Sequence, residues 1–570
     1  MKRYSTASRT PLQRISNKTT ILQMSKSLPA LACVAAIWGV LAFLVLPQDA
    51  FFSSDEGLKF IQVENFTRKG WRDFTIDYPG RELDPELSYV PINNPPPLIR
   101  EGRIYAVYPV FFPLLTVPLY RLLNYTGLYV IPLISGLLTL VITFYIARLT
   151  GGNGRSPILV LAFCTPLIFY SLVFWDHTLG AFLSTLALFL VIKNLEQPTQ
   201  LLLLVGGITL GLAIWVRSEL YVMALVMPVA LFLFGTRRLG QVLSLCLGIV
   251  IALIPLWLFQ FLIYGDFIGP HVGHLAWLAE ELPVTTDRVA IIYHTLLEGN
   301  SSPVMSFLFI MAFVASAMLV RAPKLRTNRL LVIIAFASLA LATIPNILEA
   351  ATGRPLGGLI TTSPFLVFGF AILLNSSLRQ KNRFLLALSL GYIILVCLMT
   401  PVDPGLQWGP RFLLPILPPL TILATNNFHA LNTHAGFSRR GLLKVCFLSV
   451  VALSLLVQMS GLRTLYIIKT RDLRLIENTA QVGSAHIISD EYGYAEYVAP
   501  LFYEKQFFYA RDQEAYQELT ETLLKNGIHS FAVVTYPFPS RKAVDPLVAA
   551  DGYAIRGVGE QLFEIEELKR

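Results

Sequence analysis

Long apolar segments alternate with short polar ones along most of the chain. A membrane-spanning helix needs roughly 20 predominantly apolar residues, and the first segment that meets this need reads SLPALACVAAIWGVLAFLVLP. The segments are too continuously apolar for alternating β-strands, so they predict helices. We predict about 13 spans, at residues 27–47, 126–147, 157–175, 177–193, 200–216, 220–235, 240–263, 303–320, 330–348, 356–374, 384–401, 411–426 and 441–460.

Composition supports a polytopic membrane protein. Of the 570 residues, 54% are hydrophobic and only 14% are charged, whereas soluble proteins carry about 25% charged residues. The net charge of +9 comes from basic residues in short clusters between apolar segments. That arrangement is typical of membrane topology signals and does not indicate a nucleic-acid partner. The five cysteines lie within apolar segments and show no disulfide or metal-ligand spacing.

Basic residues also predict the orientation of the chain. Residues 1–26 form a basic tail without acids, and every second connection after it carries further Arg and Lys. The positive-inside rule then places the N-terminus in the cytoplasm. An odd number of spans places the C-terminus outside, in a multi-pass protein of the plasma (inner) membrane. The basic connections contain Arg148, Arg155, Arg237, Arg238, Arg321, Lys324, Arg326, Arg329, Arg379, Lys381, Arg383, Arg439, Arg440 and Lys444.

The pattern divides the chain into a cytoplasmic tail, 1–26, a transmembrane domain, 27–460, and an extracytoplasmic domain, 461–570. Within the transmembrane domain, the first outer loop, 48–107, contains DEGLKFIQVENF, which reads as an amphipathic helix at the membrane surface. The proline-interrupted segment YPVFFPLLTVPLYRLL reads as a second interfacial helix. In the last domain, short strand-like and helix-like patterns alternate and predict a small α/β fold.

Ionisable residues gather at the predicted outer ends of the spans, where burial makes charge costly and often functional. Asp55 and Glu56 follow the first span directly, in FFSSDEGLKF. Acids also favour the first turn of a helix, so capping is the structural alternative to catalysis. Asp176 and His177 lie in the short turn of FYSLVFWDHTLG. There, Asp176 could cap a helix, or the pair could orient an acceptor hydroxyl.

Three arginines are candidates for binding a phosphate, because a planar guanidinium matches phosphate oxygens well. Arg217 lies in WVRSEL, where a structural ion pair with Glu219 is the alternative. Arg411 begins a predicted span in GPRFLLPILPPL and could instead reach the membrane surface as a solvated charge. Arg354 lies at the predicted outer side of the chain.

These features together resemble the GT-C superfamily of membrane glycosyltransferases. The resemblance lies in an acidic pair just beyond the first span, a long first outer loop with interfacial helices, and many later spans. It is carried by YPVFFPLLTVPLYRLL, FYSLVFWDHTLG, LGLAIWVRSEL and WGPRFLLPILPPL, in this order. It covers residues 27–460 and is strongest for the bacterial branch of mannosyltransferase-like and aminoarabinose transferase-like enzymes.

The resemblance implies that a sugar moves from a polyprenyl-phosphate donor to an acceptor at the outer face, as in a hexosyl- or pentosyltransferase. It implies Asp55 as the catalytic base, with Glu56 as the alternative, a second acid at Asp176, and Arg411 and Arg354 as phosphate ligands. For the mechanism, we expect Asp176 and His177 to orient the acceptor and keep Arg217 as a further candidate for the phosphate. The oligosaccharyltransferase branch holds a divalent metal and carries a tryptophan-rich tail signature. This sequence lacks that signature, so a metal is in doubt and no cofactor is assigned.

Other functions remain open at the level of sequence. A lipid or solute transporter predicts ionisable groups near the middle of its spans and paired halves, and the sequence has few such groups and no repeat. A polysaccharide polymerase or an O-antigen-ligase-like enzyme would rely on a late outer loop instead of an early acidic pair. The sugar stays undetermined, and the acceptor could be a lipid, a glycan or a protein.

Overall fold

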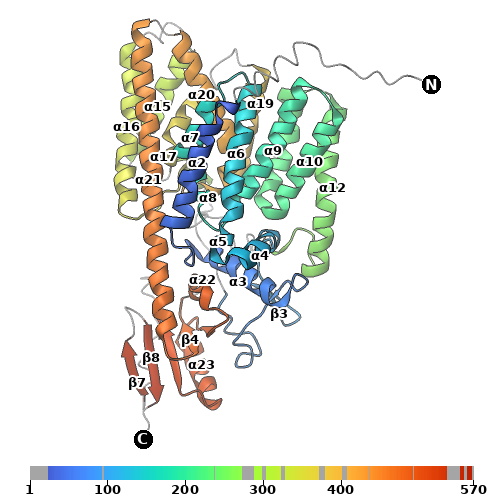
Figure 1. Ribbon diagram of the computed structural model, residues 1–570, viewed down its shortest axis with the longest axis vertical. Coiled ribbons are helices and arrows are strands. Elements are labelled where there is room, and N and C mark those ends of the chain that lie inside the picture. The colour runs from blue at the N-terminus through green and yellow to red at the C-terminus, as the bar shows by residue number, and fades with distance from the viewer. Residues whose placement is uncertain are drawn as a thin grey trace, which may run out of the picture.

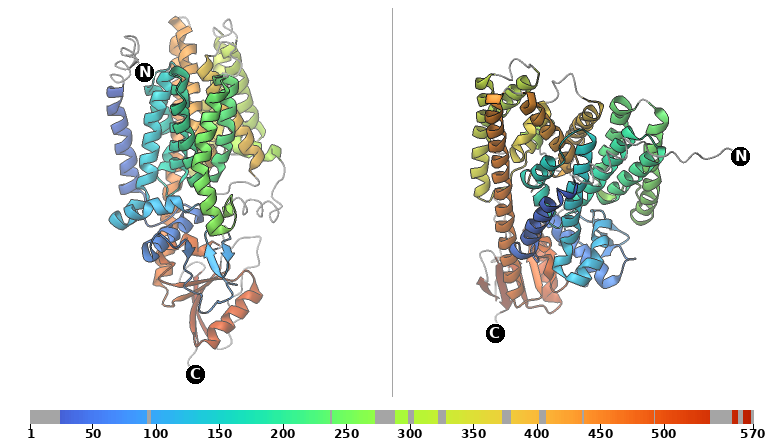
Figure 2. Two further views of the ribbon diagram at one scale, coloured as in Figure 1. Left: turned by 90° about the vertical axis from the view of Figure 1, so that its right-hand side faces the viewer. Right: turned by 45° about the horizontal axis from the view of Figure 1, so that its top comes forward.

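The computed structural model describes residues 24–92, 96–236, 238–271, 288–297, 303–321, 328–371, 379–400, 407–434, 437–491, 493–535, 553–557 and 562–567. These residues form a bundle of helices with a small mixed domain at one end (Figure 1). Helix α2 (Leu28–Val40) begins at the opposite end of the bundle (Figure 2). The start of α2 and the small mixed domain therefore lie on opposite sides of the apolar part of the bundle.

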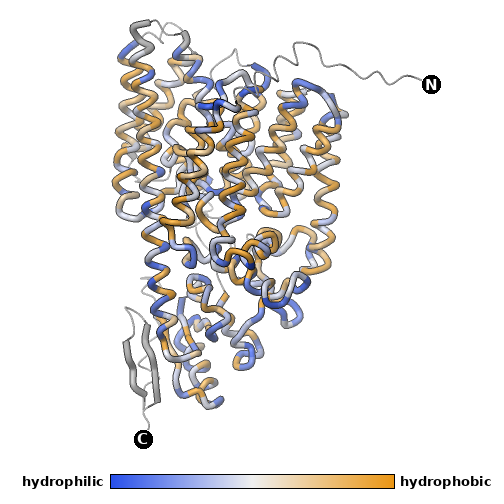
Figure 3. Tube along the Cα trace, in the orientation of Figure 1, coloured by the Kyte–Doolittle hydropathy of each residue, from blue (hydrophilic) through white to orange (hydrophobic). Residues whose placement is uncertain are grey.

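The α-helical, membrane-spanning architecture predicted from the sequence is confirmed. Seven helical segments of the described chain are long and apolar enough to cross a membrane: Leu28–Val45, Tyr125–Leu149, His177–Glu196, Leu239–Tyr264, Arg329–Ala351, Gln380–Met399 and Gly441–Gln481. Apolar residues dominate the whole bundle, and polar residues gather at its two ends (Figure 3). The remaining predicted spans correspond to shorter or interrupted helices, and the total of about 13 spans stays a prediction.

The long helices of the bundle follow the apolar segments closely. Their bounds are α6 (Val130–Leu149), α9 (His177–Glu196), α10 (Gln200–Val216), α11 (Tyr221–Ala230), α12 (Leu239–Tyr264), α14 (Arg288–Leu297), α15 (Pro303–Arg321), α16 (Arg329–Ala351) and α19 (Gln380–Met399). Short π-helical turns, η1 (Leu41–Val45) and η3 (Leu231–Gly235), complete α2 and α11.

Prolines interrupt three of the predicted spans. The segment 157–175 divides into α7 (Arg155–Cys164) and α8 (Leu167–Ser171), because Thr165 adopts an extended conformation before Pro166. The segment 411–426 begins as a 3₁₀ turn, η7 (Arg411–Ile416), and continues as α20 (Leu417–His434). The described part of 356–374 consists of α17 (Leu359–Thr362), η5 (Pro364–Leu366) and α18 (Val367–Ala371).

The first outer loop closes the end of the bundle that faces the small domain. It contains α3 (Ser54–Lys69), and α4 (Phe111–Leu123) lies across the bundle end after it (Figure 2). A three-stranded sheet separates the two helices: β1 (Thr75–Ile76), β3 (Arg103–Tyr105) and β2 (Leu98–Arg100), all antiparallel. The predicted helix 55–66 is present, but residues 56–63 are all buried, more than a helix on a membrane surface would be.

The C-terminal domain holds a five-stranded sheet of order β5-β4-β6-β8-β7. Strands β4 (His486–Ser489), β5 (Gln506–Tyr509) and β6 (Ser530–Val534) are parallel, while β8 (Leu562–Glu567) and β7 (Tyr553–Gly557) add antiparallel pairs. Its helices are α22 (Tyr494–Tyr497), η8 (Ala499–Leu501) and α23 (Gln513–Lys525). The domain shares one hydrophobic core with α3, in which Leu58 and Ile61 join Phe507 and Phe531.

One helix connects the bundle to this domain without a break. It is α21 (Phe437–Gln481), 45 residues long, which continues into the sheet at β4 (Figure 1). The predicted last span, 441–460, therefore lies in its first half, and the predicted boundary at residue 461 lies inside it. The rise of 1.5 Å per residue makes α21 roughly 67 Å long, so it crosses the membrane and extends beyond it.

Candidate active site

Asp55 forms the centre of a buried polar cluster at the domain-facing end of the bundle. The Tyr108 hydroxyl donates to Asp55 Oδ1 at 2.5 Å, and Arg411 Nη1 donates to Oδ2 at 2.8 Å. Asp55 lies in the first turn of α3, yet the structure directs its carboxylate to these partners. Both carboxylate oxygens are thus engaged by side chains from distant parts of the chain.

A second ion pair lies beside the first. Arg217 Nη1 donates to Asp176 Oδ1 at 2.8 Å, and Arg217 Nε donates to Glu219 Oε1 at 2.7 Å. Asp176 occupies the N-cap position of α9 but makes no side-chain cap hydrogen bond. The helix-cap interpretation of Asp176 is therefore wrong, because the arginine takes its carboxylate instead. The ion pair between Arg217 and Glu219 expected from the sequence is present.

Lys59 connects the two ion pairs. It follows Asp55 by one helical turn, so both side chains lie on one face of α3. Its Nζ lies 3.9 Å from Asp176 Oδ2 and 3.9 Å above the centre of the Tyr108 ring. Lys59 is fully buried, and its ammonium has no hydrogen-bond partner among the described residues. A buried ammonium without an acceptor is costly, so this position has a polar group to offer a ligand.

Aromatic rings surround the cluster and lower its local dielectric. The Arg411 guanidinium lies 5.2 Å from the Trp175 ring and 5.4 Å from the Phe412 ring. Trp175 is fully buried and stacks on Tyr170. Cations over aromatic faces are stabilised by the ring quadrupole. The arginine is therefore held by a carboxylate on one side and by aromatic faces on the other.

Burial and neighbouring charges shift the pKa values of the groups around Asp55. Burial opposes ionisation of Asp55, but Arg411, Lys59 and the Tyr108 hydroxyl outweigh it and hold the pKa of this carboxyl below its ordinary value. Burial lowers the pKa of Lys59, although Asp176 and Asp55 act against that shift. Asp55 is consequently an ionised carboxylate beside Arg411 and Lys59.

Glu56 contacts a different set of groups from its neighbour Asp55. Its Oε2 accepts a hydrogen bond from the Phe174 backbone N–H at 3.4 Å. Burial raises the pKa of Glu56 to about 7, against the opposing effect of Lys469 on α21. Lys469 is itself buried and donates to the Tyr129 hydroxyl at 2.8 Å. Glu56 therefore joins α3 to the bundle and to α21, behind the face that carries Asp55.

The structure places the other two predicted residues differently. His177 is buried beside the cluster, with its ring against Tyr170 and Trp175 and its Nδ1 4.0 Å from Glu219 Oε1. Arg354, by contrast, lies in the chain after α16 and is 77% exposed. Its ion pair is with Glu349, at 3.8 Å. The geometry thus brings together Asp55, Asp176, His177, Arg217 and Arg411, and it leaves Arg354 outside.

A divalent metal does not fit the cluster as it is arranged. Within the described parts of the chain, no group of three or more His, Cys, Asp or Glu side chains is placed to hold a metal ion. Both oxygens of Asp55 already accept hydrogen bonds, and Arg217 takes one oxygen of Asp176. Three nearby cations would also repel a metal ion, so we derive no step through one.

Several contributing residues were not assigned from the sequence. Lys59 could have been found from its spacing, since a residue four positions after Asp55 shares its helix face. Tyr108 lies in the quoted segment YPVFFP, but its approach to Asp55 depends on how the loop folds back. Lys469 follows an apolar segment and looks like an ordinary membrane-boundary lysine. Only tertiary structure shows that it faces Glu56.

Comparison of the sequence with models of protein families and with characterised proteins finds no match. The structure is similar to that of ArnT from Cupriavidus metallidurans bound to undecaprenyl phosphate, with 14% identity, 94% of this chain and 98% of that chain covered, and a TM-score of 0.48. It is also similar to the Archaeoglobus fulgidus oligosaccharyltransferase in the apo form, with 13% identity, coverages of 89% and 69%, and a TM-score of 0.46. At these sequence identities and TM-scores, the function has to be argued from the geometry of the site itself.

Proposed function

We propose that this protein is a membrane glycosyltransferase of the GT-C type, which moves a sugar from a polyprenyl-phosphate donor to an acceptor. The observation that carries the proposal is the ionised Asp55 carboxylate, held between Tyr108 and Arg411 beside two further cations. The cluster lies where the bundle meets the first outer loop, so a lipid-borne substrate could reach it from the bilayer. It combines a proton acceptor with groups that bind a phosphate.

The cations supply the stabilisation that a phosphate leaving group needs. When the bond from the anomeric carbon to the phosphate oxygen breaks, negative charge develops on that oxygen. Arg217 and Lys59 are buried, Arg411 is partly buried, and all three are positioned before the reaction, so they stabilise this charge without reorganisation. Lys59 Nζ and Arg411 Nε have no hydrogen-bond acceptor in the described chain, so both have a donor to offer the phosphate.

Asp55 supplies the base. The acceptor oxygen or nitrogen attacks the anomeric carbon, its proton passes to Asp55, and the polyprenyl phosphate departs with the bonding electrons. One displacement of this kind inverts the anomeric centre. The pairing with Arg411 weakens Asp55 as a base, since it lowers the pKa. Transfer of Arg411 from Asp55 to the donor phosphate would raise that pKa and couple donor binding to activation of the acceptor.

The neighbouring residues act through these groups. Asp176 holds Arg217 in place through its 2.8 Å hydrogen bond, and His177 packs under Trp175, which in turn lies beside Arg411. We therefore assign Asp176 and His177 to positioning of the phosphate-binding arginines as well as to orientation of the acceptor. Glu56 is a positioning residue, because its described contacts lead to the backbone and to Lys469.

The proposal includes a location. The protein is placed in the plasma (inner) membrane with its N-terminal tail in the cytoplasm, and the site and the C-terminal domain face outward. This follows from the basic connections, which lie at the ends of spans away from the cluster. Reactivity of single engineered cysteines towards an impermeant thiol reagent in intact cells would test the orientation.

The proposal is tested by complementing a strain that lacks the protein. Wild type, Asp55→Asn and the control Asp77→Asn are compared by mass spectrometry of envelope glycans and lipids; Asp77 is 63% exposed in the same outer loop. We expect a glycan mass that returns with wild type and Asp77→Asn. With Asp55→Asn it should fall about 10²–10⁴-fold, the contribution of a general base. Full restoration by Asp55→Asn would refute the assignment of the base.

A further inference from the structure

A polar cavity lies far from the catalytic cluster, between α7, α20 and α21. Its volume is about 280 Å³. Its polar lining consists of two amides, two hydroxyls, an imidazole and an ammonium, and its apolar lining of three side chains. These residues are Asn153, Asn426, Ser156, Thr425, His429, Lys444, Phe428, Phe447 and Leu448.

The cavity lies at the opposite end of the membrane-spanning bundle. Lys444 and Lys469 belong to the same helix, α21, and the rise per residue places them roughly 37 Å apart along it. Lys469 is at the level of the catalytic cluster, through its contact with Tyr129. A hydrocarbon layer is about 30 Å thick, so Lys444 reaches the headgroup region of the other leaflet.

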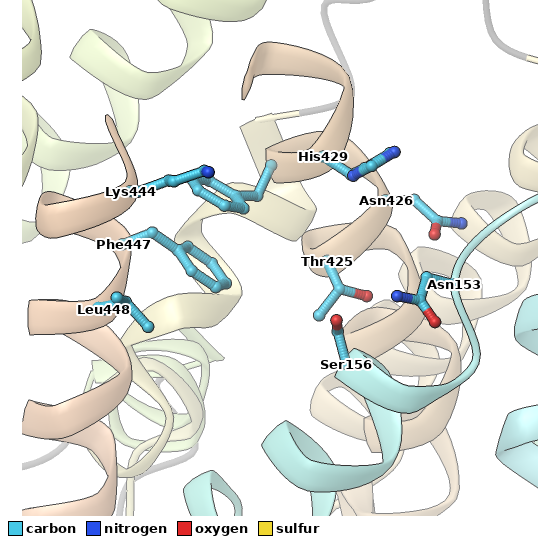
Figure 4. A pocket seen from close by; sticks show the side chains of 9 residues that line it. Asn153, Ser156, Thr425, Asn426, His429, Lys444, Phe447 and Leu448 are labelled. Carbon is cyan, nitrogen blue, oxygen red and sulfur yellow. The ribbon is translucent and has the colours of Figure 1, made fainter. Parts of the chain in front are cut away.

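The polar side of the cavity suits an anionic group. Asn153, Ser156 and Thr425 gather on one side, and Lys444 extends from α21 on the other (Figure 4). None of the nine lining residues is an acid. Amides, hydroxyls and an ammonium are the donors that bind phosphate oxygens, and Lys contributes charge as well.

The apolar side of the cavity opens towards lipid. Phe428 and Phe447 stack with their ring centres 3.7 Å apart and form one wall. Next to them, Leu448 is 63% exposed on the outer surface of α21, and Val445 is 62% exposed beside it. A ligand with an anionic head in the cavity could therefore lay an acyl chain along α21 without leaving the membrane.

We propose that this cavity binds the phosphate headgroup of an anionic phospholipid from the leaflet opposite the catalytic cluster. A volume of about 280 Å³ is near the lower bound of small-molecule sites, enough for a headgroup while the acyl chains stay outside. Basic pockets between membrane helices are a recurrent way to hold such headgroups. The site is independent of the proposed glycosyl transfer and would exist whether or not that assignment holds.

The test uses the full chain reconstituted into nanodiscs of phosphatidylcholine with or without phosphatidylglycerol. Native mass spectrometry after detergent release measures the retained lipid, and thermal unfolding measures stabilisation. Variants are Lys444→Gln and, in case that change disturbs folding, His429→Gln. The control is Lys193→Gln, which removes a lysine near the same end of the bundle, on α9 and away from the cavity. A further arm replaces lipid by soluble sn-glycerol 3-phosphate.

We expect wild type and Lys193→Gln to retain phosphatidylglycerol over phosphatidylcholine. Lys444→Gln should weaken that retention about fivefold, the effect of one lysine at an anionic lipid surface. The site would be overturned if Lys444→Gln and His429→Gln both retained phosphatidylglycerol as well as wild type does. It would also be overturned if Lys193→Gln lost as much of this retention as Lys444→Gln. Equal stabilisation by soluble sn-glycerol 3-phosphate would overturn the lipid assignment and point to a soluble phosphate ester instead.

Discussion

Arg411 Nη1 donates a hydrogen bond to Asp55 Oδ2 at 2.8 Å, although 356 positions separate the two residues in the chain. The contact joins the first turn of α3 to the first turn of η7. Neither element could place its charge in this buried region without the other, because an unpaired buried charge is costly. The site is thus assembled from both ends of the transmembrane domain.

Replacement of Arg411 tests its role towards the donor phosphate. Arg411→Gln should lower kcat/KM about 10²–10³-fold, as does removal of a single donor to a developing negative charge. Arg411→Lys should recover only part of this loss, because an ammonium lacks the planar fork and packs less well against Trp175. The measurement is turnover of a polyprenyl-phosphate sugar by purified protein.

Arg354→Gln is the matched control, since this arginine is exposed and lies outside the cluster. It should leave turnover unchanged. A large loss in Arg354→Gln, with full activity in Arg411→Gln, would reverse the two assignments and place the phosphate elsewhere.

Lys59→Met should lower both stability and activity. The change replaces a buried ammonium, 3.9 Å from Asp176 Oδ2, with an apolar group of similar length. Removal of one partner of a buried ion pair is destabilising, because it leaves the other charge less well compensated. The melting temperature in detergent should therefore fall, while the KM for the donor increases. A variant with unchanged KM would show that Lys59 does not meet the phosphate.

The pH dependence of stability should report Glu56. Its pKa in the folded protein is raised from 4.5 to about 7 by burial, so the folded state binds this proton more tightly. Stability from this group is present below pH 4.5 and is lost as pH rises to about 7. Asp55 acts in the opposite direction: its pKa is lowered from 3.8, so its contribution is lost as pH falls through the folded value.

Thermal unfolding between pH 4.5 and pH 7 separates these effects. Glu56→Gln should flatten the profile in this range, whereas Asp55→Asn should change it only at lower pH. Lys469→Met removes the cation that opposes the shift, so the loss of stability should move to higher pH. An unaltered profile in Glu56→Gln would contradict the raised pKa.

Gly57→Ala should separate the C-terminal domain from the catalytic helix. A Cβ atom at Gly57 would overlap the backbone carbonyl of Glu496, in α22. Forced overpacking of this kind costs about 1–3 kcal/mol, and backbone on both sides leaves little room for relaxation. We expect faster limited proteolysis of the domain and lower turnover. Gly39→Ala on α2, where a Cβ has no neighbour within 4 Å, should change neither.

Much of the architecture follows from residue pattern alone. Continuous apolar segments predict helices because the bilayer leaves no other way to satisfy the backbone, and acids at span ends predict a polar site. The pairings do not follow in this way. Asp55 and Glu56 are adjacent and chemically alike, yet one meets Arg411 and the other faces Lys469, because side chains one position apart on a helix diverge by about 100°.

Some predictions depended on distances that sequence does not contain. Arg354 and Arg411 both follow polar turns at the same predicted side, and only the packing of η7 against α9 shows which one reaches the cluster. The length of α21 was also missed. Its last turns are polar because only one face, with Ile476, packs into the core shared with α3 and the sheet, while the other face is exposed.

The link from Glu56 to α21 has a consequence for the order of synthesis. Lys469 follows Glu56 by roughly 400 residues, so at 5–20 residues per second it leaves the ribosome about 20–80 s later. During that interval the carboxyl group has no ammonium to face it, and burial favours its neutral form. Docking of Lys469 opposes this effect of burial, so Glu56 is expected to hold its proton more tightly in the nascent bundle than in the complete one. The affinity of the catalytic helix for that proton would thus fall as the last helix is completed.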